Sequence, residues 1–191
     1  MKIEKEMRFL EINKDQIVQK LIGLGAECVF SDARQCRYVY DFNPVDPNKW
    51  IRLRTNGHET TLTIKQVVSQ EIDGTKEWEI QVSDFDETYE MLAMMGYTPR
   101  AKQENIRSRF LLDGVEIDID KWPGIPPYVE LECDDLESIG KVVEKLGLSR
   151  YQSTTQDVSS IYENVYGINV MKIKNLAFEN ETEISKSAVR E

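Results

Sequence analysis

Charged and apolar residues alternate in seven segments of this chain, and the alternation constrains its fold more than any other feature. Alternate side chains of a β-strand point to the same face, so each segment predicts a strand with one charged and one apolar face. The charged or polar positions of the seven segments are Glu4-x-Glu6-x-Arg8, Arg52-x-Arg54, Thr61-x-Thr63-x-Lys65, Glu77-x-Glu79, Arg107-x-Arg109, Glu116-x-Asp118-x-Asp120 and Glu130-x-Glu132.

The simplest interpretation of one such segment is an antiparallel strand whose charged face meets water. Ion pairs on a solvated face contribute little to stability. A solvated face, however, usually mixes Lys, Thr, Ser and Gln, whereas here acids and bases occur in separate pairs. Arginine pairs favour bidentate binding of carboxylate or phosphate groups. Seven such segments together therefore indicate a shared binding surface.

Turn and capping signals divide the chain into eight strands and four helices. Asn56-Gly57, Asp73-Gly74 and Asp113-Gly114 predict hairpin turns between strands. Strands are predicted near residues 2–11, 34–42, 75–83, 100–112 and 128–133, and further strands flank the Asn56-Gly57 turn and follow the Asp113-Gly114 turn. Helices that begin at a capping Asn or Asp, or at about Thr155, are predicted near residues 13–24, 84–96, 135–147 and 155–166.

A faint internal repeat suggests how these elements pack. A Glu-x-Glu strand, a helix and three further strands begin at Glu4 and again at Glu77. Eight mostly antiparallel strands can close into a barrel, which removes sheet edges. The helices carry apolar stripes that need an apolar partner, so they cover the outside and leave the charged face lining a tunnel. We expect an α+β fold with one domain over residues 1–170 and a partly loose extension over residues 171–191.

Composition excludes several classes of function. The net charge of −10 disfavours a general nucleic-acid binder and an anionic membrane surface. The single histidine, His58, lies in a predicted turn, so a serine or cysteine protease mechanism lacks a base. The three cysteines have no metal-site spacing, and there is neither a long apolar run nor a signal-peptide core. We therefore expect a cytoplasmic protein.

A tunnel lined by this many charges cannot stay without counterions. Burying unpaired charges is prohibitive, so the lumen must contain partners for them. The basic rows suit several phosphate groups, but the acids would repel those phosphates unless metal ions intervened. Carboxylate sites favour Mg²⁺ or Mn²⁺, which also bind phosphate oxygens. The pattern predicts a metal-dependent polyphosphate site and excludes a carrier of apolar ligands.

The ordered set of charged motifs resembles the CYTH superfamily of triphosphate tunnel metalloenzymes over about residues 2–170. The resemblance implies an eight-stranded antiparallel tunnel, a Mg²⁺ or Mn²⁺ cofactor and roles for the matching residues. The implied triphosphate-binding residues are Arg8, Arg52, Arg54, Lys65, Arg107 and Arg109. The implied metal site comprises Glu4, Glu6, Asp118, Asp120, Glu130 and Glu132, with Glu77 and Glu79 positioning metal, basic side chains or water.

One position departs from the family pattern. The first motif of the family usually ends in Lys, and this chain has Arg8 there. Arginine keeps the charge but does not release a proton at working pH, so Arg8 is a weak candidate for proton transfer. Lys65 with Tyr38 or Tyr40 on the neighbouring strand is an alternative proton-handling pair. A phosphate-binding Lys65 beside packed tyrosines explains these residues equally well.

The expected function is metal-dependent hydrolysis of a triphosphate: inorganic tripolyphosphate, a nucleoside triphosphate or thiamine triphosphate. A first alternative is an adenylyl cyclase that converts ATP to cyclic AMP and pyrophosphate. A second is a non-catalytic module that binds polyphosphate or nucleotide, although simple anion capture needs no acids. The expected partner is a small triphosphate rather than nucleic acid or membrane, and the resemblance leaves room for a homodimer.

Overall fold

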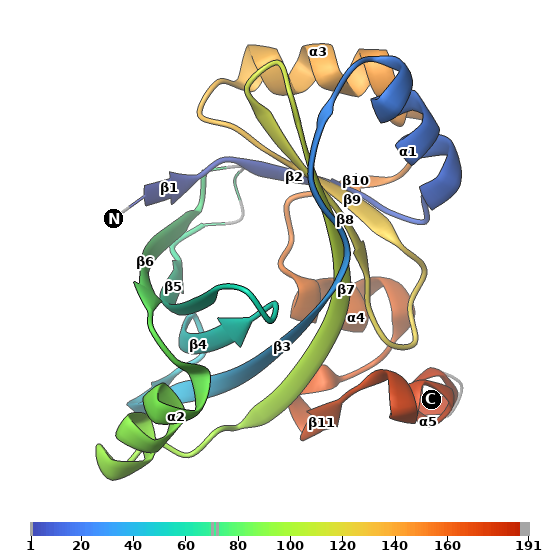
Figure 1. The fold of residues 1–191 in the computed structure, drawn as a ribbon. Helices are drawn as coiled ribbons and strands as arrows, with labels where there is room; N and C mark the ends of the chain where they lie inside the picture. Colours follow the sequence, from blue (N-terminus) through green and yellow to red (C-terminus); the bar gives the residue numbers. More distant parts are fainter. Residues whose placement is uncertain (1, 70, 72, 188–191) are drawn as a thin grey trace.

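The computed structural model describes residues 2–69, 71 and 73–187, with residues 2–4 and 187 described by their backbone alone. These residues form an α+β fold around one strongly curled sheet (Figure 1). The strands are β1 (Lys2–Glu4), β2 (Glu6–Phe9), β3 (Glu27–Asp46), β4 (Lys49–Thr55), β5 (Thr60–Val67), β6 (Thr75–Val82), β7 (Ala101–Leu112), β8 (Val115–Lys121), β9 (Tyr128–Glu132), β10 (Ser153–Thr154) and β11 (Asn175–Leu176). The helices are α1 (Lys14–Gly23), α2 (Phe85–Met94), α3 (Leu136–Leu146), α4 (Val158–Tyr166) and α5 (Glu181–Ser187).

The N-terminal segment joins the two ends of the curled sheet. From β6 the order runs through β5, β4, β3, β7 and β8 to β9. β1 pairs with β6, whereas β2 pairs with β9, and Lys5 alone separates β1 from β2. Counted as one strand, β1 and β2 complete the set of eight predicted strands. The pairing is antiparallel except where β11 lies parallel to β7, so the predicted fold class is confirmed.

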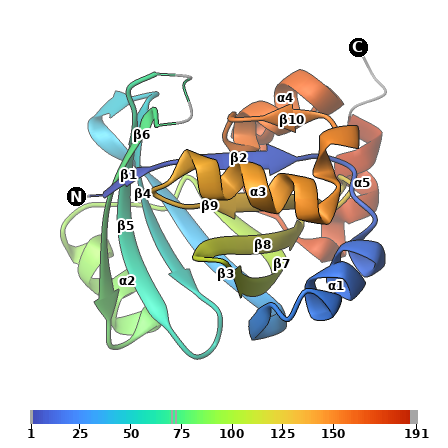
Figure 2. The same cartoon turned by 90° about the horizontal axis from the view of Figure 1, so that it is seen from above.

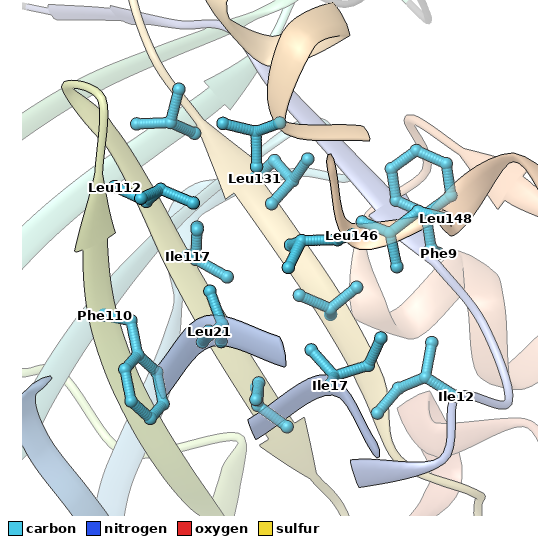
Figure 3. Close-up of a cluster of buried hydrophobic side chains, with 14 of the residues drawn as sticks. Phe9, Ile12, Ile17, Leu21, Phe110, Leu112, Ile117, Leu131, Leu146 and Leu148 are labelled. Atoms are coloured by element: carbon cyan, nitrogen blue, oxygen red, sulfur yellow. The ribbon is translucent and has the colours of Figure 1, made fainter. Parts of the chain in front are cut away.

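The helices lie outside the curled sheet, as predicted from their apolar stripes. α1 and α3 cover the outer face of β7, β8 and β9, where Leu21, Ile117, Leu131 and Leu146 share one buried cluster (Figure 3). α2 packs against β4, and Figure 2 shows it on the opposite side of the molecule from α1. α4 and α5 share a second cluster that includes Trp122.

Capping residues fix where the helices begin, as the sequence predicts. Asn13 accepts a hydrogen bond from the backbone N–H of Gln16, and Asp84 accepts one from Glu87. Asp135 caps α3 in the same way, and Gly147 ends it with a left-handed φ of 64°. The fourth helix begins at Val158 rather than near Thr155, because Asp157 is its cap.

Two segments differ from the sequence expectation. β3 begins at Glu27 rather than near residue 34, since its first half pairs with β7 through two register shifts around Asp32, which has a φ of 52°. Such bulges interrupt the alternation that reveals a strand. The C-terminal extension folds at least as far as α5, because Ile184 is buried beside Gly124. Residues 188–191 lie outside the described residues.

Among the described residues, no helix is both long and apolar enough to cross a membrane.

Candidate functional site

The concave face of the sheet encloses a cavity of about 840 Å³. Strand alternation directs the charged side chains into this cavity, because the residues that alternate with them along each strand point outward to the helices or to solvent. The cationic lining residues on the strands include Arg8, Arg37, Arg52, Arg54, Lys65, Arg107 and Arg109. The acidic lining residues on the strands include Glu6, Glu77, Glu79, Glu116, Glu130 and Glu132. The charged-lumen prediction is therefore confirmed for these side chains.

One wall of the cavity is a tight ladder of ion pairs between β7 and β8. Arg107 donates from Nε and Nη2 to the two oxygens of Asp120, at 2.9 and 2.6 Å, and also contacts Asp118. Arg109 donates to both oxygens of Asp118, at 2.8 and 2.7 Å. Burial would lower the pKa of Arg107, but Asp118 and Asp120 outweigh it and raise that pKa. Both arginines are thus held in place before any ligand arrives.

Arg8 holds two carboxylates at the edge where β2 meets β9. Its Nη2 lies 2.9 Å from Glu6 Oε2, and its Nε lies 2.7 Å from Glu130 Oε2. Its Nη1 donates to the backbone oxygen of Gln156 at 2.8 Å. Burial would raise the pKa of Glu130, but Arg8 and Arg107 hold it at about 2. Arg8 therefore positions both carboxylates through two ion pairs and is itself anchored to the backbone of Gln156.

The other wall, from β4 to β6, has looser pairs. Arg52 Nη2 lies 3.4 Å from Glu77 Oε1 and 3.1 Å from Glu79 Oε2. Arg54 reaches Glu79 Oε2 at 3.5 Å, and Lys65 lies 2.9 Å from Glu77 Oε2. Burial, together with Arg52 and Arg107, lowers the pKa of Arg54 to about 9. Arg54 and Arg107 line the same cavity, so the basic rows of the two walls share one space.

Arg37, which belongs to none of the paired-charge motifs, lines the same cavity from β3. It is the Cα partner of Arg54 on β4 and of Gln103 on β7, so it lies between the two basic rows. A single base between Cys36 and Tyr38 shows no charge pair, and pairs were the signal that identified the other strands. The inward alternation of Gln35, Arg37 and Val39 is the pattern that would have found it.

Several predicted site residues lie elsewhere. Asp118 and Asp120 are buried beneath the arginines of β7 and are absent from the cavity lining of the described residues. Tyr40 is buried in the cluster between β4 and α2, and Tyr38 packs against that cluster. Both tyrosines alternate with inward-facing residues on β3, so the structure does not bring either to Lys65. The side chain of Glu4 lies outside the described residues.

The acids at the β2–β9–β8 edge have the chemistry of a divalent-metal site. Glu132 is the Cα partner of Glu6 on one side and of Glu116 on the other. Burial, with Asp118 and Glu132 nearby, raises the pKa of Glu116 to about 7 despite Arg109. In the described part of the chain, no three acidic, His or Cys side chains are already arranged around a metal position, since arginines hold several of them. The oxygen donors nevertheless fit Mg²⁺ or Mn²⁺ by type and by charge.

Comparisons with known proteins agree with this fold. PH1012 from Pyrococcus horikoshii OT3 has a TM-score of 0.69 at 20% identity, covering 81% of this chain and 96% of its own. A putative adenylate cyclase from Vibrio parahaemolyticus has a TM-score of 0.62 at 21% identity, covering 76% and 84%. The putative adenylyl cyclase HpAC1 from Hippeastrum, whose structure "reveals a dominant triphophatase activity", has a TM-score of 0.56 at 14% identity, covering 87% and 96%. These likenesses show the fold.

No curated protein matches the chain. The model of the CYTH domain matches residues 2–159, which include the strands that line the cavity, and the chain therefore belongs to the CYTH domain family.

Proposed function

We propose that this protein hydrolyses a triphosphate-containing substrate with the help of a divalent metal ion. The observation that carries this proposal is the meeting of basic rows from both walls in one cavity, beside an edge of carboxylates. An anion binder alone would need only the bases. A protein that bound metal alone would need only the acids.

The basic residues would hold the triphosphate chain. Arg52, Arg54 and Lys65 make ion pairs that a phosphate can join or replace, since their nitrogens reach into the cavity. Arg107 and Arg109, although paired with acids, also line the cavity from the opposite wall. Arginine and lysine donors around a phosphoryl group stabilise the charge that develops as the anhydride bond breaks. Lys65 remains a candidate for proton handling.

The carboxylates Glu6, Glu130 and Glu132 would hold the metal, with Glu77 and Glu79 orienting the bases opposite. A divalent cation held there would offset the negative charge of the phosphate groups. Arg8 contributes by holding Glu6 and Glu130 in place, and with Arg107 it lowers the pKa of Glu130. Its two ion pairs and its hydrogen bond to Gln156 support a positioning role rather than proton transfer.

A substrate panel with resolved products tests the proposal. Tripolyphosphate, ATP and thiamine triphosphate are each incubated with the protein and Mg²⁺ or Mn²⁺, with and without excess chelator. We expect orthophosphate plus pyrophosphate from tripolyphosphate, and orthophosphate plus ADP from ATP, with no turnover under chelator. Turnover that persists unchanged in chelator, or binding of every substrate without any product, contradicts the proposal.

The same panel separates hydrolysis from cyclisation. A cyclase must hold the nucleobase and aim the ribose 3′-hydroxyl at the α-phosphate. In the connection after β8, Trp122 and Ile125 are buried in the cluster with α4, and Trp122 also lines the cavity, where Arg37 lies over its ring. Cyclic AMP and pyrophosphate in equal amounts, with tripolyphosphate untouched, would replace hydrolysis with the cyclase alternative.

A further inference from the structure

We infer that Arg37 is an additional phosphate-binding residue of this cavity, placed between the two basic rows to take a phosphoryl oxygen of the substrate. The inference rests on the proposed function for the identity of the anion. Its basis is a buried guanidinium on the cavity wall for which the protein itself supplies no carboxylate.

The contrast with the other buried arginines is direct. The side chains of Arg8, Arg37 and Arg107 are all less than a tenth exposed. Arg8 and Arg107 are each bound by two or more carboxylates. Arg37 is 6% exposed and has no carboxylate partner among the described residues. In the described part of the chain, Arg37 is therefore a buried cation that no ion pair holds.

The neutral contacts of Arg37 orient its side chain without neutralising it. Its Nη2 donates to Gln35 Oε1 at 3.0 Å and to Asn105 Oδ1. Its guanidinium carbon lies 4.5 Å from the centre of the Trp122 ring, within the range of a cation–π contact. Its Nε is buried without a partner in the described part of the chain. The group is fixed in direction while part of its donor capacity is unused.

The surroundings of Arg37 make the lack of a carboxylate partner energetically costly. Burial lowers the pKa of Arg37; Arg52, Arg54 and Arg107 lower it further, and the nearby Asp120, which Arg107 holds, offsets only part of this. An unpaired buried charge is strongly unfavourable, and neighbouring charges of the same sign add to that cost. A polyphosphate between the two walls would supply negative charge to all four arginines together. Binding at Arg37 would also break no existing ion pair, unlike binding at Arg107.

The position of Arg37 indicates what it adds to the site. As the Cα partner of both Arg54 and Gln103, it connects the β4 row to the β7 row. A chain of phosphates held by both rows would pass this point, whereas a single orthophosphate would satisfy only one row. We therefore expect Arg37 to contribute to the affinity for tripolyphosphate more than to the affinity for orthophosphate.

The test measures tripolyphosphate binding by calorimetry under chelator, so that no turnover occurs, and thermal melting of the empty protein. The variant is Arg37→Met, and the matched control is Arg34→Met on the same strand. The Arg34 side chain is 62% exposed and pairs with Glu104 at 2.7 Å. We expect Arg37→Met to weaken tripolyphosphate binding on the order of 10–100-fold, the effect of one charged hydrogen bond. We also expect its melting temperature to stay level or rise, and the Arg34→Met control to bind normally.

A second variant keeps the inference testable if Arg37→Met folds poorly. Arg37→Gln removes the charge but retains an amide donor for Gln35 or Asn105. We expect the same loss of affinity for this variant. Normal affinity in Arg37→Gln or Arg37→Met overturns the inference while leaving the proposed hydrolysis intact if the wild type turns over. If the Arg37 variants bind tripolyphosphate more weakly but the wild type turns over no triphosphate, the result supports the anion-binding role of Arg37 and rejects hydrolysis.

Discussion

The two walls of the cavity use the same motif in different settings. Each has an Arg-x-Arg pair facing acids, on β4 in one wall and on β7 in the other. On β7 the pairs reach Asp120, whose side chain is 0% exposed. On β4 they reach Glu79, whose side chain is 35% exposed, at 3.1–3.5 Å. The outer faces differ too, since α1 and α3 cover one wall while Ile80 on the other is 61% exposed.

This difference shows that burial, rather than the motif, sets the energy of an ion pair. The β7–β9 wall is a preorganised scaffold in which removing one partner leaves a buried charge. In the β4–β6 wall, water already weakens the pairs that Arg52 and Arg54 make with Glu79, so a phosphate can replace those pairs at small cost. We therefore interpret the first wall as fixing the geometry of the site and the second as adapting to the ligand.

The largest expected effect separates the acids of the two walls. Asp120→Ala leaves Arg107 without its bidentate partner and should lower the free energy of unfolding by about 3–5 kcal/mol. The matched change Glu79→Ala should cost no more than about 1 kcal/mol, since its pairs are partly solvated. Urea unfolding of the empty proteins measures both. Equal losses would show that the walls do not differ in this way.

The outer faces should differ nearly as much. Leu131 is fully buried between the sheet and the helices (Figure 3), and Leu131→Ala should cost about 2–5 kcal/mol. Ile80→Ala, on the exposed face of β6, should change stability by about 0.5 kcal/mol or less. The same unfolding experiment at several protein concentrations provides the check. A large, concentration-dependent loss for Ile80→Ala would mean that a partner covers that face.

Turnover should fall when an arginine is removed from either wall, whereas stability should fall only for the β7 wall. Arg52→Ala and Arg107→Ala should each lower kcat/KM on the order of 10–100-fold, the equivalent of one charged hydrogen bond. Only Arg107→Ala should also destabilise the fold, because it leaves the buried Asp120 without its arginine partner. Steady-state kinetics and unfolding on the same preparations separate the two effects. Wild-type kinetics in both variants would remove the basic rows from the substrate site.

The smallest change tests the edge between the walls. Arg8→Lys keeps the charge, but an ammonium cannot reproduce the separate contacts of Arg8 with Glu6, Glu130 and Gln156. We expect about a 10-fold loss in kcat/KM, from the loss of one such charged contact, with a pH profile of unchanged shape. A gain in rate with a new acidic limb would instead show that a lysine at this position transfers a proton.

Much of this architecture could be predicted because strand alternation is local. The paired charges identified the strands, and the caps at Asn13, Asp84 and Asp135 placed the helices. Long-range packing was less accessible. Nothing local distinguishes Asp120, buried under an arginine, from Glu130, which lines the cavity.

The misplaced and missed residues have similar causes. Tyr40 was placed beside Lys65 by proximity of strands, whereas alternation on β3 turns it to the outer face. Arg37 was missed because it is a single charge rather than a pair. Helix α5 was missed because Ile184, in an otherwise polar run, finds a buried position only after the chain has folded.

The most direct test is a crystal structure of the protein with Mn²⁺ and a non-hydrolysable imido analogue of tripolyphosphate, with anomalous diffraction to locate the metal. We predict the analogue along the cavity between Arg52 and Arg107, within hydrogen-bond distance of Arg37. We also predict manganese between its oxygens and the carboxylates Glu130 and Glu132. Anion and metal bound on the outer surface, with the cavity holding neither at saturating concentrations, would contradict the account.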